Sequence, residues 1–166
     1  MIEKIVSGGQ TGVDQAALDM AVECGISIGG WCPRGGLDEN GRNILEMHAS
    51  LIEATTSVPS ERTKLNVRDS DGTLIIVPSL PLPEAIKDGT QLTIDEALRL
   101  ERPHLIISLA EKEGTAETIL NWCTENNIHT LNIGGPRESS CPGIYEECCE
   151  LFHELYIYLK PKLQFS

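Results

Sequence analysis

The sequence predicts an α/β protein with a Rossmann-like, three-layer α/β/α architecture and a mainly parallel five-stranded sheet. Short apolar segments alternate along the chain with segments whose apolar residues recur at helical spacing. The later apolar runs, such as Thr73–Val77 and Leu105–Leu109, are continuous, which is typical of strands buried on both faces of a parallel sheet. Because parallel strands are joined by right-handed crossovers, this pattern favours a doubly wound sheet. The length of 166 residues suits one domain, residues 1–166.

Five short segments have the composition of strands. They are rich in aliphatic or β-branched residues, and most of them adjoin glycine, proline or a polar loop. The expected strands are Ile2–Ser7, Ile26–Trp31, Thr73–Val77, Leu105–Leu109 and His129–Ile133. We expect Ile2–Ser7 and Thr73–Val77 to be neighbours at the centre of the sheet, because both border the point where the strand order should reverse.

Apolar spacing and cap residues indicate four helices. One covers Asp14–Cys24, and Gly25 follows at a position that suits a helix C-terminus. A capping box at Thr93–Glu96 starts the second helix, and Thr115 caps the third. The last helix begins near Gly143 and carries an apolar stripe formed by Ile144, Cys148, Leu151, Leu155 and Leu159.

Three connecting segments are less regular. Residues 59–71 are polar and form either a helix or an ordered loop, and Gly41–His48 suits a short helix. Pro78–Gly89 contains three prolines, which predict an extended or turning connection.

The chain is acidic, with 13 Lys and Arg residues against 25 Asp and Glu and a formal charge of −12. Such a surface repels nucleic-acid phosphates and anionic membranes, so we expect neither as a partner. A small anion responds to local donors and is not excluded. Neither a signal-peptide pattern nor a run of 18 apolar residues occurs, so a cytoplasmic location is expected.

The cysteines do not form a zinc motif. None of the six belongs to a Cys-x-x-Cys pair: Cys24, Cys32, Cys123, Cys141, Cys148 and Cys149. Structural zinc sites favour two such pairs, so we expect no structural zinc. We expect Cys148 and Cys149 to stay reduced and to behave as small hydrophobic residues.

The loop after the first strand is the leading candidate site, because ligands of such sheets bind beyond the carboxyl ends of the strands. It consists of Ser7, Gly8, Gly9, Gln10, Thr11 and Gly12, with Asp14 just after it. Glycines let the backbone approach a ligand, and the following helix offers unpaired amides and the positive end of its dipole. The pattern predicts an anion site, with a tight turn as the alternative. It lacks the Gly-x-Gly-x-x-Gly spacing and the Walker lysine, which disfavours P-loop ATP hydrolysis.

A second loop repeats the arrangement of strand, glycine pair, polar loop and helix. Gly134 and Gly135 follow the last strand, and Arg137 and Ser139 lie in the polar part. A guanidinium group suits a phosphate, although a solvated loop arginine is the alternative. We expect the amides of Gly8–Gly12 to hold a phosphate and Arg137 to close over it.

Three other loops contribute lesser candidates. Arg68 and Asp71 come just ahead of a core strand, where helix caps and a turn are the alternative interpretation. Gly114 and Thr115 begin a helix and could add amides to the same crevice. Arg34 is the cation of the loop after the second strand.

Together these motifs resemble those of the molybdenum carrier family. The matching segments occur in order over nearly the whole chain: Val6–Asp14, Ala16–Asp19, Gly29–Pro33, Asn66–Thr73 and Asn132–Ser139. The resemblance implies a Rossmann-like fold of a circularly permuted branch, related to the lysine-decarboxylase-like and DprA-like proteins. It also implies a bound molybdenum cofactor (molybdopterin) or a nucleotide, and a homo-oligomer.

The favoured function is therefore a carrier that binds a phosphate-bearing pterin or nucleotide-like small molecule at the glycine-rich loops. An alternative is a hydrolase acting on a nucleotide or nucleotide-sugar bond, with Asp14, Asp69 or Asp71 as its carboxylate. No nucleophile–base pair is evident for such an enzyme in the sequence. A protein-interaction module with unused loops is the third alternative.

Overall fold

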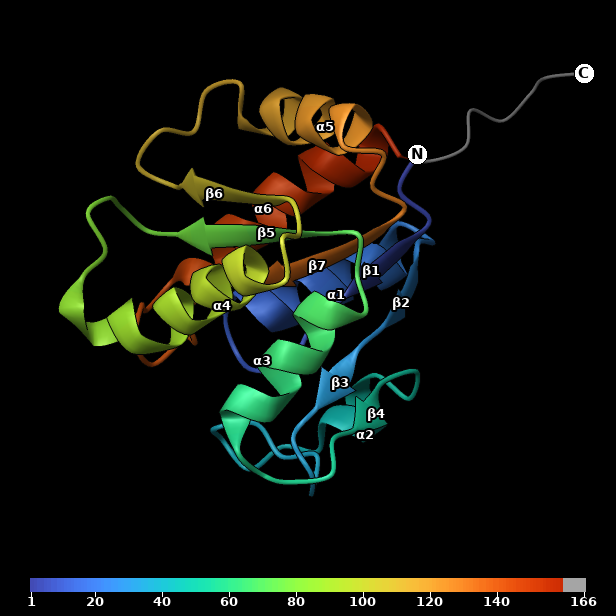
Figure 1. Ribbon diagram of the computed structural model, residues 1–166, viewed down its shortest axis with the longest axis vertical. Coiled ribbons are helices and arrows are strands. Elements are labelled where there is room, and N and C mark those ends of the chain that lie inside the picture. Colours follow the sequence, from blue (N-terminus) through green and yellow to red (C-terminus); the bar gives the residue numbers. More distant parts are fainter. Residues whose placement is uncertain (160–166) are drawn as a thin grey trace, which may run out of the picture.

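The computed structural model describes residues 1–159, without the side chain of Asp88. Its main sheet has five strands, which pair in parallel in the order β2-β1-β7-β5-β6 (Figure 1). The strands are β1 (Lys4–Val6), β2 (Ser27–Gly29), β5 (Gly72–Val77), β6 (His104–Ser108) and β7 (Thr130–Gly134). The predicted three-layer α/β class is confirmed. Residues 160–166 of the predicted single domain lie outside the described residues.

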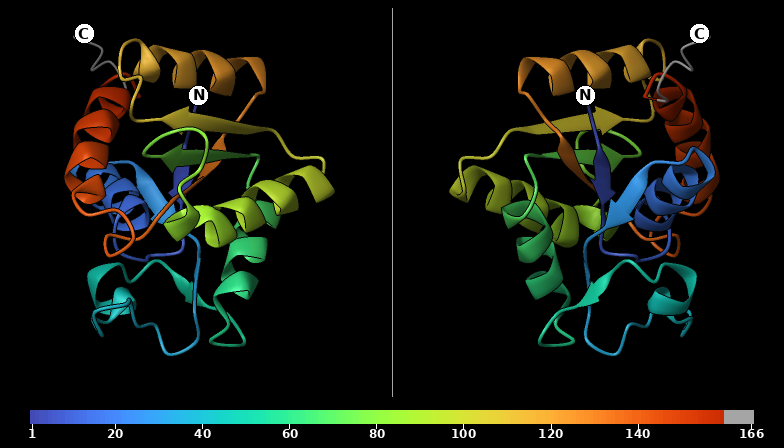
Figure 2. Two further views of the ribbon diagram at one scale, coloured as in Figure 1. Left: turned by 90° about the vertical axis from the view of Figure 1, so that its left-hand side faces the viewer. Right: turned by 90° about the vertical axis from the view of Figure 1, so that its right-hand side faces the viewer.

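Helices cover both faces of the sheet (Figures 1 and 2). One face carries α1 (Val13–Glu23), α5 (Thr115–Glu125) and α6 (Ile144–Ile157), and the other carries α3 (Pro59–Arg68) and α4 (Lys87–Arg99). In β5, Leu74 and Ile76 belong to the core beneath α1, α5 and α6, whereas Ile75 and Val77 pack with Ile94 of α4. A strand buried on both faces needs apolar residues at every position, as the sequence of β5 predicts.

The predicted apolar stripe of the last helix is confirmed. Each of its five members is buried in the core on that face of the sheet: Ile144, Cys148, Leu151, Leu155 and Leu159. The first four lie in α6, which packs against α1. Burial of large apolar side chains stabilises such a helix by about 1.5–3 kcal/mol for each side chain that is fully buried.

The predicted strand Ile26–Trp31 is wrong in one respect, because it is divided between two sheets. Its first part is β2, and its end belongs to β3 (Trp31–Cys32), which pairs with β4 (Ile52–Glu53) in a separate two-stranded sheet. Gly30 makes the break with a φ of 120°, a region that favours glycine. A side chain at Gly30 would also meet the backbone of Ser7.

The expected adjacency of the strands Ile2–Ser7 and Thr73–Val77 is wrong. β7 lies between β1 and β5: Ile5 pairs with Leu131, and Leu74 pairs with Ile133. The chain crosses from β2 to β5 and leaves a gap that its last strand fills. The apolar composition of a segment indicates that the strand is buried, but it does not indicate which strand is its neighbour in the sheet.

Two predicted helix caps are also wrong. α4 begins at Lys87, so Thr93 lies inside the helix, where its hydroxyl donates to the Gly89 carbonyl oxygen at 3.3 Å. The carboxylate of Glu96 accepts hydrogen bonds from Arg99 instead of forming a capping box. Capping-box residues are also compatible with a helix interior when the helix starts earlier.

The other cap is at α5. Gly114 with a φ of 71° occupies the N-cap position, and Thr115 is the first helical residue. The Thr115 hydroxyl donates to the carbonyl oxygens of Glu111 and Lys112, at 3.0 and 2.8 Å. It therefore closes the preceding turn and does not cap a helical amide.

The irregular segments contain more helix than their composition indicated. The helical alternative for residues 59–71 is correct, because α3 covers Pro59–Arg68. Gly41–His48 contains the short helix α2 (Ile44–Met47), which Asn43 caps. The Pro78–Gly89 connection ends in a 3₁₀ turn (Glu84–Ile86) and the start of α4.

Candidate functional site

A cavity of about 420 Å³ lies where the carboxyl ends of β1 and β7 meet α3 and α4. The first glycine loop contributes Gly8 and Gln10 to its wall, and the second contributes Gly134 and Gly135. This volume falls within the range of small-molecule pockets, roughly 300–1,000 Å³. The cavity therefore lies at the carboxyl ends of the strands, where the sequence analysis placed the candidate site.

Several predicted residues of the first loop support its shape and do not line the cavity. The Ser7 hydroxyl donates to the Ile133 carbonyl oxygen at 2.6 Å, which ties β1 to β7. Thr11 accepts a hydrogen bond from the Glu138 amide at 3.1 Å. A Cβ added at Gly12, whose φ is 80°, would lie 2.5 Å from the Pro136 carbonyl oxygen. These contacts pack the two glycine loops against each other.

Gly9 has a similar role. Its φ is 80°, and an added Cβ would lie 2.5 Å from Cγ2 of Ile44 and 3.3 Å from Cδ2 of Leu51. Both neighbours belong to the small apolar cluster beneath α2. The absence of a side chain at Gly9 thus allows close packing of the first loop on that cluster.

Amides of the first loop already have partners within the protein. The Gln10 amide donates to Oδ2 of Asp14 at 3.2 Å, and the Thr11 amide donates to Oε1 of Gln10 at 3.0 Å. The Val13 amide donates to the Pro136 carbonyl oxygen at 3.3 Å. The start of α1 is therefore not a row of unpaired donors.

Asp14 meets a cation that sequence reasoning missed. Nη1 of Arg62, from α3, lies 3.4 Å from Oδ2 of Asp14, and both side chains line the cavity. Only 14% of the Arg62 side chain and 6% of that of Asp14 are exposed. Burial raises the pKa of the Asp14 carboxyl, and the opposing effects of the Arg62 charge and the Gln10 amide do not cancel this rise.

Arg62 has spare hydrogen-bonding capacity. Its Nε atom is buried and has no hydrogen-bond partner among the described residues. A guanidinium group carries five N–H donors, so Arg62 can contact Asp14 and still bind another acceptor. No local sequence signal marks this residue, because its partner lies 48 positions away in the chain.

The second glycine loop presents a cation at the cavity. Arg137 and Ser139 line it together with Gly134 and Gly135, as the sequence predicts for this loop. Nε of Arg137 lies 3.7 Å from Oε2 of Glu39, and the Arg137 side chain is about half exposed. The same carboxylate accepts hydrogen bonds from the amide and hydroxyl of Ser139, at 3.1 and 3.0 Å.

Neutral polar side chains that were not among the predicted site residues also line the cavity. Asn66, Thr90 and Asn132 line the cavity and are themselves buried. Asn66 exchanges two hydrogen bonds with the backbone of Trp31, and Asn132 donates to Thr73 at 3.3 Å. These bonds hold polar groups at fixed positions, as a selective pocket requires.

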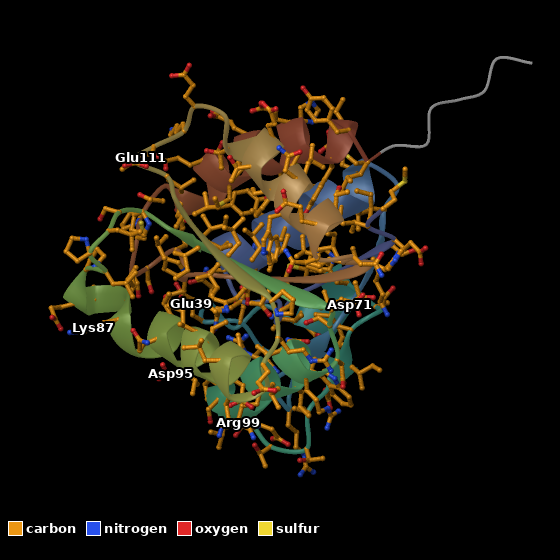
Figure 3. All side chains as sticks on the ribbon, turned by 45° about the horizontal axis from the view of Figure 1, so that its top comes forward. Glu39, Asp71, Lys87, Asp95, Arg99 and Glu111 are labelled. Atoms are coloured by element: carbon orange, nitrogen blue, oxygen red, sulfur yellow. The ribbon has the colours of Figure 1, made fainter. Side chains whose placement is uncertain are left out.

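The predicted residues Arg68 and Asp71 lie away from the cavity. Asp71 is at the amino end of β5, where its carboxylate accepts hydrogen bonds from the amides of His129 and Thr130, at 3.0 and 2.8 Å. In Figure 3, Asp71 lies at the end of the sheet opposite to Glu111, which follows β6. Arg68 forms an exposed ion pair with Asp69, with Nε 2.7 Å from Oδ1.

The remaining predicted residues, Arg34, Gly114 and Thr115, are not among the cavity's lining residues. Arg34 is exposed in the loop after β3. Gly114 and Thr115 form the start of α5, which belongs to the opposite layer from α3 and α4 (Figure 2).

Metal ligands do not converge in the part of the chain that the structure describes. Residues 1–159 contain no group of three or more His, Cys, Asp or Glu side chains placed to hold a metal ion. The six cysteines are free. None of the described helices is long and apolar enough to cross a membrane.

The fold and the ligand-sized cavity at the strand ends define the class of the protein as a Rossmann-like α/β protein. The chain belongs to the circularly permutated YpsA SLOG family, whose model matches residues 5–156. It is also similar to a crystal structure from Syntrophus aciditrophicus SB named "Putative molybdenum carrier protein". The two share 42% sequence identity with a TM-score of 0.85, over 94% of this chain and 95% of the other. No curated protein matches the sequence.

Proposed function

We propose that this chain is a molybdenum cofactor carrier that binds a phosphate-bearing pterin, or a nucleotide-like molecule of similar size, between its two glycine-rich loops. The observation that carries the proposal is the cavity of about 420 Å³ with two arginines, Arg62 and Arg137, in its wall. Guanidinium groups bind phosphates through paired, charge-assisted hydrogen bonds. The name of the similar protein from Syntrophus aciditrophicus supports the cargo.

The chemistry of the wall fits both parts of such a ligand. Arg137 and the backbone of the second loop suit the phosphate, because the guanidinium is about half exposed and Arg137 lines the cavity. Asn66, Thr90 and Asn132 offer amide and hydroxyl groups to a ring with donors and acceptors on its edge. Since the described residues hold no cluster of metal ligands, recognition would rest on the phosphate and the ring system.

Binding is better supported than hydrolysis by the positions of the carboxylates. Of the three carboxylates considered for a hydrolase, Asp14 lines the cavity, whereas Asp69 and Asp71 are not among its lining residues. Asp14 is already engaged by Arg62 and by the Gln10 amide. A carrier needs only the fixed polar wall.

Two measurements test this function. Native mass spectrometry of the purified protein should show a co-purifying pterin phosphate or nucleotide as a mass increment. Calorimetry with AMP, a pterin phosphate and molybdopterin should then show that one of them binds with one ligand per chain. If none of the three binds to correctly folded protein, the proposed function is wrong.

A further inference from the structure

The first glycine loop lies around a hydrogen-bond acceptor that belongs to the protein, the carboxylate of Asp14. The carboxylate of Asp14 accepts a hydrogen bond from the Gln10 amide at 3.2 Å and contacts Nη1 of Arg62 at 3.4 Å. Backbone amides that follow a strand, combined with a guanidinium, are the usual partners of a bound phosphate.

Asp14 is held firmly in this position. Its side chain is 6% exposed, and it lies in α1, which packs against α6 and β7. The position of Gly8 allows the arrangement, because a Cβ at Gly8 would collide with the Arg62 guanidinium and would lie 3.1 Å from Oδ2 of Asp14. The carboxylate is thus a built-in part of the loop.

The charged side chains around the cavity indicate how the Asp14 carboxylate affects the binding of an anion. Four charged side chains line it among the described residues: Asp14 and Glu84 against Arg62 and Arg137. Glu84 is exposed and its carboxylate lies 3.4 Å from Nζ of Lys87, so its effect is weakened by solvent. Asp14 is the buried negative charge, and it lies against the donors that an anion would need.

We propose that Asp14 is a specificity-determining residue that occupies the anion cradle of the first glycine loop and thereby excludes small free oxyanions from it. The inference rests on the proposed function, because it assigns the two loops different parts of the same ligand. The ligand's phosphate lies at the second loop, beside Arg137. At the first loop, Asp14 accepts a hydrogen bond from a hydroxyl or amino group of the ligand. Inorganic phosphate and sulfate lack the organic part and gain nothing from Asp14.

Sulfate is the direct probe, because it is a tetrahedral dianion whose charge does not change near neutral pH. Asp14→Asn keeps the size of the side chain and its acceptor oxygen but removes the charge. The variant should bind sulfate roughly ten- to a hundredfold more tightly than wild type, the range expected for a hydrogen bond to a charged group. Titration followed through backbone amide resonances should show the largest changes at Gly8 and Gln10.

Glu84→Gln is the matched control, since it removes one negative charge from the same cavity outside the cradle. It should change sulfate affinity much less than Asp14→Asn does. Asp14→Ala provides a second variant, in which the cradle is emptied and sulfate should bind at least as tightly as in Asp14→Asn. Circular dichroism identifies the variants that retain the fold.

The inference is overturned if folded Asp14→Asn binds sulfate no more tightly than wild type, or if Glu84→Gln has an equal effect. It is also overturned if the amides of Gly8 and Gln10 do not respond to sulfate. The proposed function is tested separately. If wild type binds none of AMP, a pterin phosphate and molybdopterin, the proposed carrier function is wrong. The comparison of sulfate affinities would still decide the role of Asp14.

Discussion

Arg62 of α3 and Asp14 of α1 form a largely buried ion pair in the wall of the cavity, with Nη1 3.4 Å from Oδ2. The pair links the helical layers on the two faces of the sheet, because α1 and α3 cover opposite faces (Figure 1). It also brings a cation to the first glycine loop, which has none in its own sequence.

Removing the cation of this pair should destabilise the fold. Arg62→Met leaves the Asp14 carboxylate buried without its counter-charge, and breaking a buried pair costs about 3–5 kcal/mol. The loss should shrink as pH falls, because a protonated Asp14 needs no counter-charge, and its pKa is already raised by burial. Urea unfolding at several pH values measures this.

The matched control is Arg68→Met in the same helix, where the pair with Asp69 is exposed to solvent and should contribute little to stability. The double variant Asp14→Asn with Arg62→Met should lose less stability than the sum of the two single variants. Equal losses for Arg62→Met and Arg68→Met would contradict this account of the pair.

The approach of the two glycine loops predicts a large effect at Gly12. Both Gly12 and Gly25 have a positive φ, 80° and 73°, in a region that favours glycine, so alanine is strained at either position. At Gly12 the new Cβ would also lie 2.5 Å from the Pro136 carbonyl oxygen, whereas nothing lies within 4 Å at Gly25. Gly12→Ala should therefore lower the free energy of unfolding clearly more than Gly25→Ala, and similar losses in urea titrations would argue against the loop contact.

A pH-dependent contribution is expected from Asp19, which joins α1 to α6. Burial raises the pKa of its carboxyl, but hydrogen bonds from His48 and Tyr145 more than offset this, so the pKa lies below its usual value. The Tyr145 hydroxyl donates to Oδ2 of Asp19 at 2.6 Å. A lowered pKa in the folded state stabilises the protein above the unfolded value, about 3.9. This contribution is lost as pH falls through the folded pKa.

Tyr145→Phe should therefore reduce stability at neutral pH more than in acid, where Asp19 is protonated in both proteins. Unfolding in urea at neutral pH and at a pH below the lowered folded pKa of Asp19 measures the difference. Tyr158→Phe, at a residue that is 65% exposed, is the control and should be nearly neutral at both pH values. A constant deficit for Tyr145→Phe across this range would show that the hydrogen bond to Asp19 is not its cause.

The cysteines should differ in reactivity according to their burial. Burial raises the pKa of the Cys123 thiol to about 12 and that of Cys148 further, so neither forms much thiolate near neutral pH. Cys141 and Cys149 are partly exposed. Alkylation of the native protein, mapped by mass spectrometry, should modify Cys141 and Cys149 first. Equally fast modification of Cys123 in folded protein would contradict the described core.

Local sequence patterns predicted the strands well, because burial on both faces leaves a continuous apolar run such as Leu74–Val77. They did not predict that β7 would separate β1 from β5. Strand order depends on contacts between residues far apart in the chain, such as Ile5 with Leu131, and no single segment records them. The break at Gly30 likewise depends on the distant backbone of Ser7.

The residues of the candidate site were likewise predicted only where the signal is local in the sequence. Gly8, Gln10 and Arg137 were predicted because glycine loops after strands have a local signature, and all three line the cavity. Arg62 was missed because α3 reaches the site only in the tertiary structure. Asp71 was a misleading candidate. It precedes β5 and therefore lies at the amino end of the parallel strands, whereas the loops that follow strands lie at their carboxyl end (Figure 3).

The central claim is that the cavity between the glycine loops binds the phosphate-bearing ligand. Calorimetry with the ligand that binds best among AMP, a pterin phosphate and molybdopterin tests it most directly, on wild type and two arginine variants. Arg137→Ala should weaken binding roughly ten- to a hundredfold, since a hydrogen bond to a charged group contributes about 1.5–3 kcal/mol. Arg34→Ala removes the same charge from an exposed loop that does not line the cavity, and it should bind like wild type. Equal affinity of Arg137→Ala and wild type, or an equal loss in Arg34→Ala, would contradict the assignment of this cavity as the binding site.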